Sequence, residues 1–178
     1  AGTIEFLLDR DKNFYFMEMN NRIQVEHPVT EMESGVDLVK QQIYIAAGLP
    51  LSITQDQVEL RGHAIECRIN AEDPYKKFRP CPGTLKEVHF PGGFGVRIDS
   101  AAYTDYEIPP YYDSMIAKVI VHDDTRDGAI RKMRSTLGEL ILDGVVTNLD
   151  FQYEILNNEE FQKGNFTTDF ISQQFPDM

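Results

Sequence analysis

The chain has 178 residues, of which 42% are hydrophobic, and it carries a formal net charge of −12. This length fits one domain or one and a half, and the hydrophobic content is sufficient for a folded core. An acidic chain without a run of lysine and arginine is a poor candidate for binding nucleic acid or an anionic membrane surface. No stretch approaches the roughly 18 apolar residues of a membrane span.

The start of the chain predicts a fragment, and the two cysteines predict an intracellular protein. The first residues, AGTIEFLLD, lack an initiator methionine and the basic start of a signal peptide, so we expect a piece of a longer chain. Cys67 and Cys81 have no CxxC spacing, which predicts neither a zinc site nor a disulfide framework. Reduced thiols are typical of the cytoplasm, where we expect this protein.

Two strands are predicted at residues 3–9 and 14–19, joined by the polar loop RDKN. If Asp9 pairs with Phe14, Glu5 lies opposite Glu18. Two opposed carboxylates destabilise a sheet unless a cation lies between them or one holds a proton. Asn20 follows one strand step later, and oxygen ligands of this kind suit Mg²⁺ or Mn²⁺. The alternative is a register shifted by one residue, with both carboxylates facing water.

A row of polar residues continues along residues 16–30, which we predict to be extended as far as Pro28. The row falls at every second position, so that its side chains share one face of a strand. Its members are Glu18, Asn20, Arg22, Gln24 and Glu26. An ordinary half-buried strand also alternates, but a solvated face usually carries Lys, Thr or Ser. The row therefore indicates a functional site.

The rest of the chain predicts a mixture of helices and antiparallel strands. A helix at residues 36–47 ends at Gly48, and residues 51–60 are predicted to be a linker. Further strands are expected at residues 62–71, 84–90, 95–98 and 114–122, with a loop at 73–83. Further helices are expected at 126–142, at 148–156 with Asn148 as its cap, and at 168–175. The predicted fold class is α+β.

The segment EMNNRIQVEHPVTE resembles the signature of biotin carboxylases, the ATP-grasp component of biotin-dependent acyl-CoA and pyruvate carboxylases. The resemblance continues through RGHAIECRINAEDP, PGGFGVR, PPYYDSMIAK and ILDGVVTN, and so covers nearly the whole chain. It implies that residues 1–50 form the C-terminal end of an ATP-grasp domain and that 61–172 form a biotin carboxylase C-terminal domain. The lysines and glycine-rich lid that hold ATP would precede residue 1.

The resemblance also implies a reaction, the ATP-dependent carboxylation of biotin with bicarbonate through carboxyphosphate. The implied metal ligands, for two Mg²⁺ or Mn²⁺ ions, are Glu5, Glu18 and Asn20. ATP would contact Glu5, Leu7 and Glu18, although a core residue is the preferred interpretation of Leu7. Bicarbonate would be held by Arg22, Gln24, the main-chain N–H of Val25, and Glu26. Glu26 would be the base that removes the bicarbonate proton.

Three residues in the second half receive implied roles. Arg68 matches the position that stabilises the enolate-like oxygen of biotin. The alternative for Arg68 is a surface ion pair with Glu66 or Glu72. Phe94 and Arg97 match the dimer interface of the family, although Phe94 could also be an ordinary turn anchor.

The expected partners are a biotin carboxyl carrier protein, a carboxyltransferase and a second copy of the chain. An acetyl-CoA carboxylase of bacterial type, supplying malonyl-CoA for fatty acid synthesis, is the first expectation, and pyruvate or propionyl-CoA carboxylase is the alternative. A non-catalytic dimerisation module and another ATP-grasp ligase, such as a carbamoyl-phosphate synthetase domain, are further alternatives. The isolated 178 residues are predicted to be inactive.

Overall fold

The computed structural model describes residues 1–176 and divides into two compact units, Ala1–Arg61 and the chain from Gly62 onward. All the strand pairs described are antiparallel, and helices follow or connect them. This arrangement confirms the predicted α+β class.

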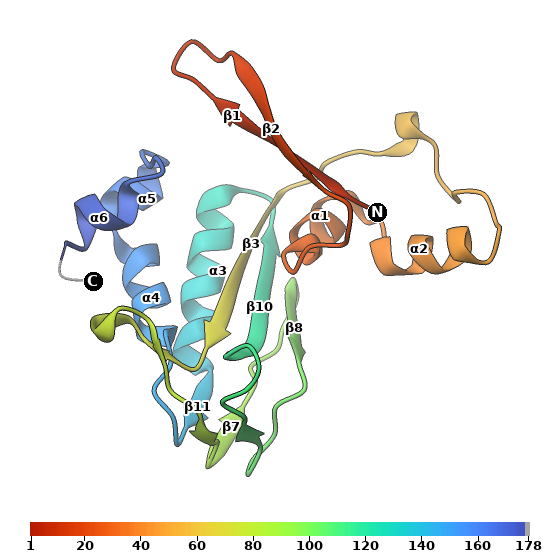
Figure 1. Ribbon diagram of the computed structural model, residues 1–178. Coiled ribbons are helices and arrows are strands. Elements are labelled where there is room, and N and C mark those ends of the chain that lie inside the picture. The colour runs from red at the N-terminus through yellow and green to blue at the C-terminus, as the bar shows by residue number, and fades with distance from the viewer. Residues whose placement is uncertain (177–178) are drawn as a thin grey trace. The chain divides into compact units, whose positions relative to one another are not determined.

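The first unit begins with a hairpin of β1 (Thr3–Leu8) and β2 (Phe14–Asn20) (Figure 1). The Asp9 carboxylate closes the connecting loop, because it accepts hydrogen bonds from the main-chain N–H groups of Asp11 and Asn13, both at 2.9 Å. Asparagine and aspartate favour such a loop, and Lys12 adopts a left-handed backbone within it, with φ 66°. Two helices, α1 (His27–Ser34) and α2 (Leu38–Ala46), and the short 3₁₀ helix η1 (Gln55–Gln57) complete the unit.

The prediction that residues 16–30 are extended as far as Pro28 is wrong. Strand β2 ends at Asn20, and α1 begins at His27 with Pro28 in its first turn. Proline is accepted there because the first helical N–H groups have no partner within the helix. The predicted helix at 36–47 is confirmed, but it begins at Leu38 because the Asp37 side chain caps it, accepting from the Lys40 N–H at 2.8 Å.

The second unit is built on a three-stranded sheet with the order β3-β10-β8. Its strands are β3 (His63–Asn70), β10 (Met115–Asp123) and β8 (Val96–Ser100). Helix α3 (Arg126–Glu139) packs along β3 and β10 (Figure 1). The apolar face of the sheet and the inner face of α3 form the core, whose fully buried members include Ile69, Val119, Val121 and Met133. Ile65, Cys67 and Ile69 share the face of β3 that packs into this core.

Short strand pairs and helices surround this sheet. The pairs join β4 (Glu72–Asp73) to β5 (Arg79–Pro80), β6 (Gly83–Thr84) to β9 (Glu107–Ile108), and β7 (Glu87–His89) to β11 (Ile141–Asp143). The remaining helices are η2 (Pro74–Lys76), α4 (Leu149–Asn157), α5 (Glu159–Lys163) and α6 (Phe170–Gln174). Within residues 1–176, no helix has the length and apolar character needed to cross a membrane.

Tertiary pairing explains three differences from the predicted elements. The helix expected at 126–142 stops at Glu139, because residues 141–143 pair with β7 instead of continuing the helical pattern. The strand expected at 84–90 divides into β6 and β7 around the fully buried Leu85, whose N–H donates to the Tyr106 carbonyl at 2.9 Å. The loop expected at 73–83 contains short strands, and α5 was not predicted at all.

Candidate functional site

The hairpin places Glu5 directly opposite Glu18, as predicted. The pairing nearer the tip differs from the expected one, because Leu8 rather than Asp9 lies opposite Phe14. The two registers are reconciled by a bulge at Met17, where β2 carries one residue more than β1. The bulge therefore brings the two carboxylates together.

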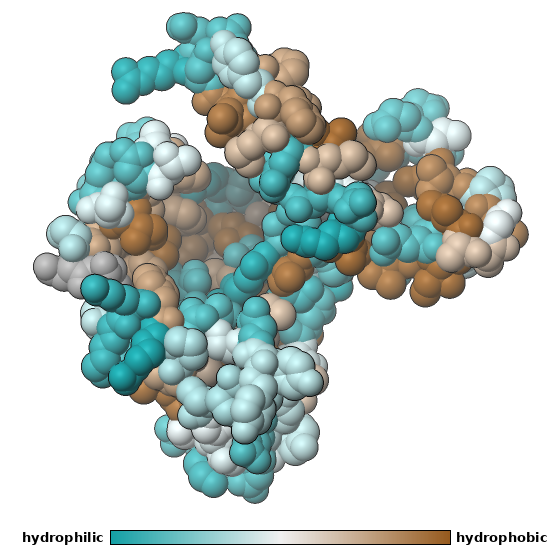
Figure 2. All heavy atoms as spheres, viewed as in Figure 1, coloured by the Kyte–Doolittle hydropathy of each residue, from teal (hydrophilic) through white to brown (hydrophobic). Residues whose placement is uncertain are grey.

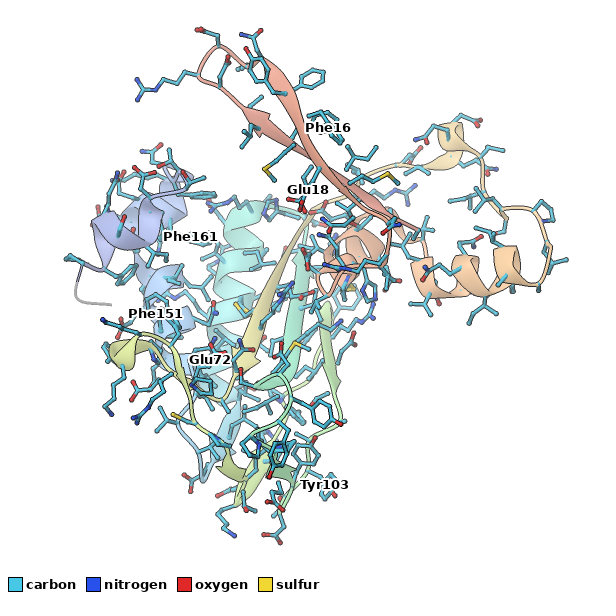
Figure 3. All side chains as sticks on the ribbon, viewed as in Figure 1. Phe16, Glu18, Glu72, Tyr103, Phe151 and Phe161 are labelled. Atoms are coloured by element: carbon cyan, nitrogen blue, oxygen red, sulfur yellow. The ribbon has the colours of Figure 1, made fainter. Side chains whose placement is uncertain are left out.

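Amide donors lie between these carboxylates. The Asn20 Nδ2 donates to Glu5 Oε1 at 2.8 Å and to Glu18 Oε1 at 3.2 Å. The Gln24 Nε2 donates to the same Glu5 oxygen at 3.2 Å. Figure 3 shows Glu18 on β2, farther from the hairpin tip than Phe16. Two carboxylates and two amides thus converge on one point, although Gln24 lies beyond the end of the strand.

This cluster has the donor chemistry of a small oxygen-liganded metal site. Within the described part of the chain, no three His, Cys, Asp or Glu side chains are grouped so as to hold a metal ion. Mg²⁺ does not require such a group, because it retains water and commonly takes one or two carboxylates together with substrate phosphates. Asn20 can add an oxygen if its amide turns, since amide O and N occupy equivalent positions. Glu5, Glu18 and Asn20 therefore fit a magnesium ion that is shared with a phosphate.

The residues predicted to hold bicarbonate gather in the connection between β2 and α1. Arg22, Gln24 and Glu26 line one open cavity of about 660 Å³ within the first unit. Glu26 occupies the position immediately before α1, and Val25 lies in the same turn. Gln24 links this cavity to the carboxylate cluster, because its side chain reaches Glu5. The residues come together through a turn, and not along one strand face.

Leu7 lies in the outer half of the hairpin opposite Tyr15. Its side chain is 56% exposed, so the preferred interpretation of Leu7 as a core residue is wrong. The exposed apolar surface remains compatible with a contact to a flat ring.

In the second unit, Arg68 lies on the face of β3 that is opposite the core. Its Nε is 3.9 Å from Glu66 Oε1, and its side chain is 44% exposed while that of Glu66 is only 4% exposed. The ion pair with Glu66 therefore exists, but it is anchored on a buried carboxylate and is not a surface pair. Glu72, the other predicted partner, accepts a short hydrogen bond of 2.5 Å from the Ser114 hydroxyl.

Lys118 and Asp99 join this polar face and were not predicted from the sequence. Lys118 lies opposite Arg68 on one side and opposite Asp99 on the other. Asp99 receives two hydrogen bonds of 2.9 Å from the Arg97 guanidinium, and Lys118 Nζ lies 3.3 Å from it. The Arg97 guanidinium, helped by Lys118, holds the pKa of Asp99 below its usual range despite partial burial. Cross-strand register, which cannot be read from one strand alone, brings these charges together.

Phe94 is 98% exposed, with Lys132 Nζ 5.8 Å from the centre of its ring. An exposed ring fits both the interface interpretation of Phe94 and the alternative of an ordinary turn residue beside Gly92 and Gly93. Arg97 is only one-third exposed, and its guanidinium is engaged by Asp99. The two residues predicted at a dimer interface thus differ, since Phe94 offers apolar surface and Arg97 is part of the sheet's charge network.

Two family models match the chain. The Biotin carboxylase C-terminal domain matches residues 66–173, and the Carbamoyl-phosphate synthase L chain, ATP binding domain matches residues 1–54. Biotin carboxylase of Nostoc sp. is 60% identical over 97% of this chain and 39% of its own length. Biotin carboxylase 1 of Bacillus subtilis is 56% identical over 96% of this chain and 38% of its own length. The chain thus spans less than two-fifths of the length of these curated relatives.

Solved structures agree with the sequence relatives. The biotin carboxylase subunit of a pyruvate carboxylase has a TM-score of 0.96 and 48% identity, covering 99% of this chain and 39% of its own. The biotin carboxylase domain dimer of Hydrogenobacter thermophilus 2-oxoglutarate carboxylase, in complex with MgADP, ADP and bicarbonate, has a TM-score of 0.95 and 49% identity. It covers 97% of this chain and 38% of its own. From these matches, which confirm the resemblance noted in the sequence, the chain belongs to the biotin carboxylase family.

Proposed function

We propose that this chain supplies one part of a biotin carboxylase active site, which carboxylates biotin on its carrier protein with bicarbonate at the expense of ATP. The observation that carries the proposal is the convergence of Glu5, Glu18, Asn20 and Gln24 beside the cavity of Arg22 and Glu26. A phosphoryl-transfer site needs a cation-binding point next to an anion-binding point. In this assignment residues 1–50 are the end of an ATP-grasp domain and 61–172 are the biotin carboxylase C-terminal domain.

Glu5, Glu18 and Asn20 would hold the divalent ions, with Mg²⁺ preferred over Mn²⁺ by analogy with the related domain solved with MgADP. When bound, such ions neutralise the phosphate charge during phosphoryl transfer. Glu5 and Glu18 would thereby also face the ATP phosphates, and Leu7 would contact the adenine ring. The chain's own contribution is to keep two carboxylates opposed, which the amides of Asn20 and Gln24 support.

Arg22 and Gln24 would bind bicarbonate. A guanidinium presents paired donors that match a planar anion, and the Gln24 amide and the Val25 N–H add neutral donors. Glu26 would accept the bicarbonate proton, for which a carboxylate within hydrogen-bond reach is required. An ionised Glu26 repels an anionic substrate. The positive charge of Arg22 must therefore offset the negative charges of both Glu26 and bicarbonate.

Arg68 would stabilise the oxygen of deprotonated biotin as its negative charge develops. The buried Glu66 carboxylate, 3.9 Å away, would limit the positions of the guanidinium while leaving it accessible. The final carboxyl acceptor is set by a separate carboxyltransferase. We favour acetyl-CoA, with pyruvate or propionyl-CoA as alternatives, and a cytoplasmic homodimer as the assembly.

The decisive experiment is Glu26→Gln in the complete enzyme that we propose contains this chain. Loss of the base should lower kcat for biotin carboxylation by about 10²- to 10⁴-fold, with little change in the KM for ATP. The matched control is Glu59→Gln, because Glu59 is an exposed carboxylate of the same unit that pairs with Arg61 at 2.6 Å. A near-normal kcat in Glu26→Gln would disprove the base assignment. The isolated chain should cleave no ATP with bicarbonate and free biotin.

A second candidate function is a dimerisation module without catalysis, which the 98% exposure of Phe94 favours. Light scattering of the isolated chain, with and without Phe94→Ala, separates the two. A dimer abolished by Phe94→Ala, combined with normal turnover of Glu26→Gln in the complete enzyme, would favour the module.

A further inference from the structure

Asn148 uses its side chain in an unexpected way. It lies at the cap position of α4, yet its side chain makes no capping hydrogen bond. Its Oδ1 accepts from the main-chain N–H of Asn70 at 2.9 Å, and its Nδ2 donates to the main-chain carbonyl of Arg68 at 3.1 Å. Its own main-chain N–H donates to the Asn70 carbonyl at 3.1 Å. The residue is only 5% exposed.

These bonds take the place of a missing strand. β3 is the edge of the sheet β3-β10-β8, so the outward main-chain groups of β3 need partners from outside the sheet. The Asn148 amide offers one acceptor and one donor, as a peptide group of a neighbouring strand would. A conventional cap, which contributes about 1 kcal/mol, is given up for this contact.

The contact falls beside an irregularity in the pairing of β3 with β10. On the inner side of β3, the register with β10 shifts between Met115 and Ala117, opposite Asn70 and Ile69. A bulge of this kind interrupts the hydrogen-bond ladder and bends the strand. Asn148 bonds the outer side of Asn70, and of Arg68 two residues earlier, so β3 is held at this end by Asn148 as well as by β10.

The backbone that Asn148 holds is that of Arg68. A strand side chain takes its direction from the backbone at its own position, and a rotation of the strand end moves the guanidinium. Lys118 lies opposite Arg68 and Glu66 lies 3.9 Å from it, so a displaced Arg68 would meet a like charge or lose its pair. A displacement of about 1 Å in a catalytic group can cost about 10²-fold in rate.

We propose that Asn148 is a positioning residue for Arg68, which it holds in the catalytic orientation by hydrogen bonds to the backbone at Arg68 and Asn70. The proposal rests on the function proposed for Arg68. Asn148 itself touches no substrate in this assignment and acts through β3.

The test compares two asparagines at successive helix starts in the complete enzyme. Asn148→Ala removes both side-chain bonds to β3 and keeps the main-chain bond to the Asn70 carbonyl. Asn158→Ala is the matched control, because Asn158 caps α5 in the ordinary way, accepting from Glu160 N–H at 2.9 Å and Phe161 N–H at 3.1 Å, and both contacts lie within its own helix. Asn158→Ala also removes a third bond, from Asn158 Nδ2 to Gln174 Oε1 at 3.0 Å, and none of its three bonds reaches β3. The control therefore loses at least as many side-chain hydrogen bonds as Asn148→Ala, which loses two.

Asn148→Ala should lower kcat for biotin carboxylation by about 10- to 100-fold. The KM for ATP and the slow bicarbonate-dependent ATP cleavage without biotin, which do not need Arg68, should stay within about twofold of the unsubstituted enzyme. Asn158→Ala should leave both reactions within the same limits. Hydrogen exchange should show lost protection for residues 66–72 in Asn148→Ala only. If Asn148→Ala does not fold, Asn148→Ser, whose hydroxyl can satisfy one partner, should give a smaller loss with the same selectivity.

Two results would overturn the proposal. One is an unchanged carboxylation rate in Asn148→Ala although residues 66–72 have lost protection. The other is a parallel fall of ATP cleavage without biotin, which would indicate general damage. Failure of the underlying function has a separate signature, because Arg68→Ala would then carboxylate biotin at the normal rate, and both proposals would fall together.

Discussion

The two units of this chain differ in how much apolar surface each buries. From Gly62 onward, the sheet and α3 enclose apolar side chains such as Ile69, Val119 and Met133, none of which is exposed. Among residues 1–61, Pro28 is the one buried residue, and Phe14 and Ile43 are 69% and 62% exposed. Figure 2 shows hydrophobic atoms at the surface of the hairpin and of α2. Apolar surface of this extent marks a region built to contact further protein or a ligand.

The comparison separates stability from chemistry. The first unit contains most of the proposed ATP, metal and bicarbonate residues, but it is held mainly by local hydrogen bonds such as those of Asp9. The second unit supplies a rigid support for Arg68. The contrast is expected, because binding segments are often drawn from the less stable part of a fold.

The largest expected difference between the units is in the free energy of unfolding. Met133→Ala should lower the stability of the second unit by about 2–5 kcal/mol, because it leaves a cavity in a fully packed core. Ile43→Ala in the first unit should change the stability of the isolated chain by no more than about 0.5 kcal/mol, since Ile43 is 62% exposed. Denaturant unfolding followed by far-ultraviolet circular dichroism measures both. Equal effects would show that the first unit has a core of its own.

A smaller effect is expected on acidification. Hydrogen bonds from Arg97 lower the pKa of Asp99, and those from Asn13 lower the pKa of Asp9. A carboxyl whose folded pKa lies below its unfolded value, about 3.9, stabilises the fold above that pH and loses this effect as the pH falls through the folded pKa. Asp99→Asn should cost the second unit about 1–2 kcal/mol at neutral pH, and this difference should shrink below about pH 4.

Asp9 provides the comparison for that experiment. Its bonds are confined to the hairpin loop of the first unit, so Asp9→Asn should leave the unfolding free energy of the second unit unchanged at every pH. Urea unfolding between pH 2 and pH 7 tests both variants. If the loss of unfolding free energy in Asp99→Asn is as large at pH 2 as at pH 7, the charged pair of Asp99 and Arg97 is not its source.

The smallest effect concerns thiol labelling, which has almost no energetic consequence at neutral pH. Burial, with a further contribution from the Glu66 charge, raises the pKa of Cys67 to about 12, whereas Cys81 is partly exposed. At pH 8 the folded chain should therefore react rapidly with a thiolate reagent at Cys81 alone. Cys67 should react only when the second unit unfolds. The denaturant concentration at which half of Cys67 is labelled should therefore match the unfolding midpoint of the second unit and not that of the hairpin. Rapid modification of both thiols would show that β3 opens locally, without global unfolding of the second unit.

The sequence predicted local features well and long-range ones poorly. The opposed pair of Glu5 and Glu18 follows from one hairpin and was correct, even though the register at the tip was not. The alternation of polar residues fits a strand up to Glu26, but Pro28 can begin a helix as readily as it ends a strand.

Asn148 illustrates what no local pattern contains. As asparagine before a helix it was predicted to be a cap, whereas its partners lie 78 and 80 residues earlier in the chain. Lys118 and Asp99 likewise become neighbours of Arg68 and Arg97 only through the pairing of three strands. The side chains proposed to touch ligands were chosen from the sequence, whereas the side chains that hold them in place were found only in the fold.

The bulge at Met17 gives the hairpin a tolerance for insertions and deletions. Between the bulge and the tip, Leu8 pairs with Phe14 and Phe6 pairs with Phe16. On the other side of the bulge the register is shifted by one residue, so that Glu5 pairs with Glu18. A loop longer or shorter by one residue could be absorbed by gaining or losing that extra residue, and the carboxylates would keep their alignment. Hairpins of different length can therefore keep the two carboxylates opposed, so a gap at the tip in a comparison of two such hairpins is not evidence against a shared carboxylate pair.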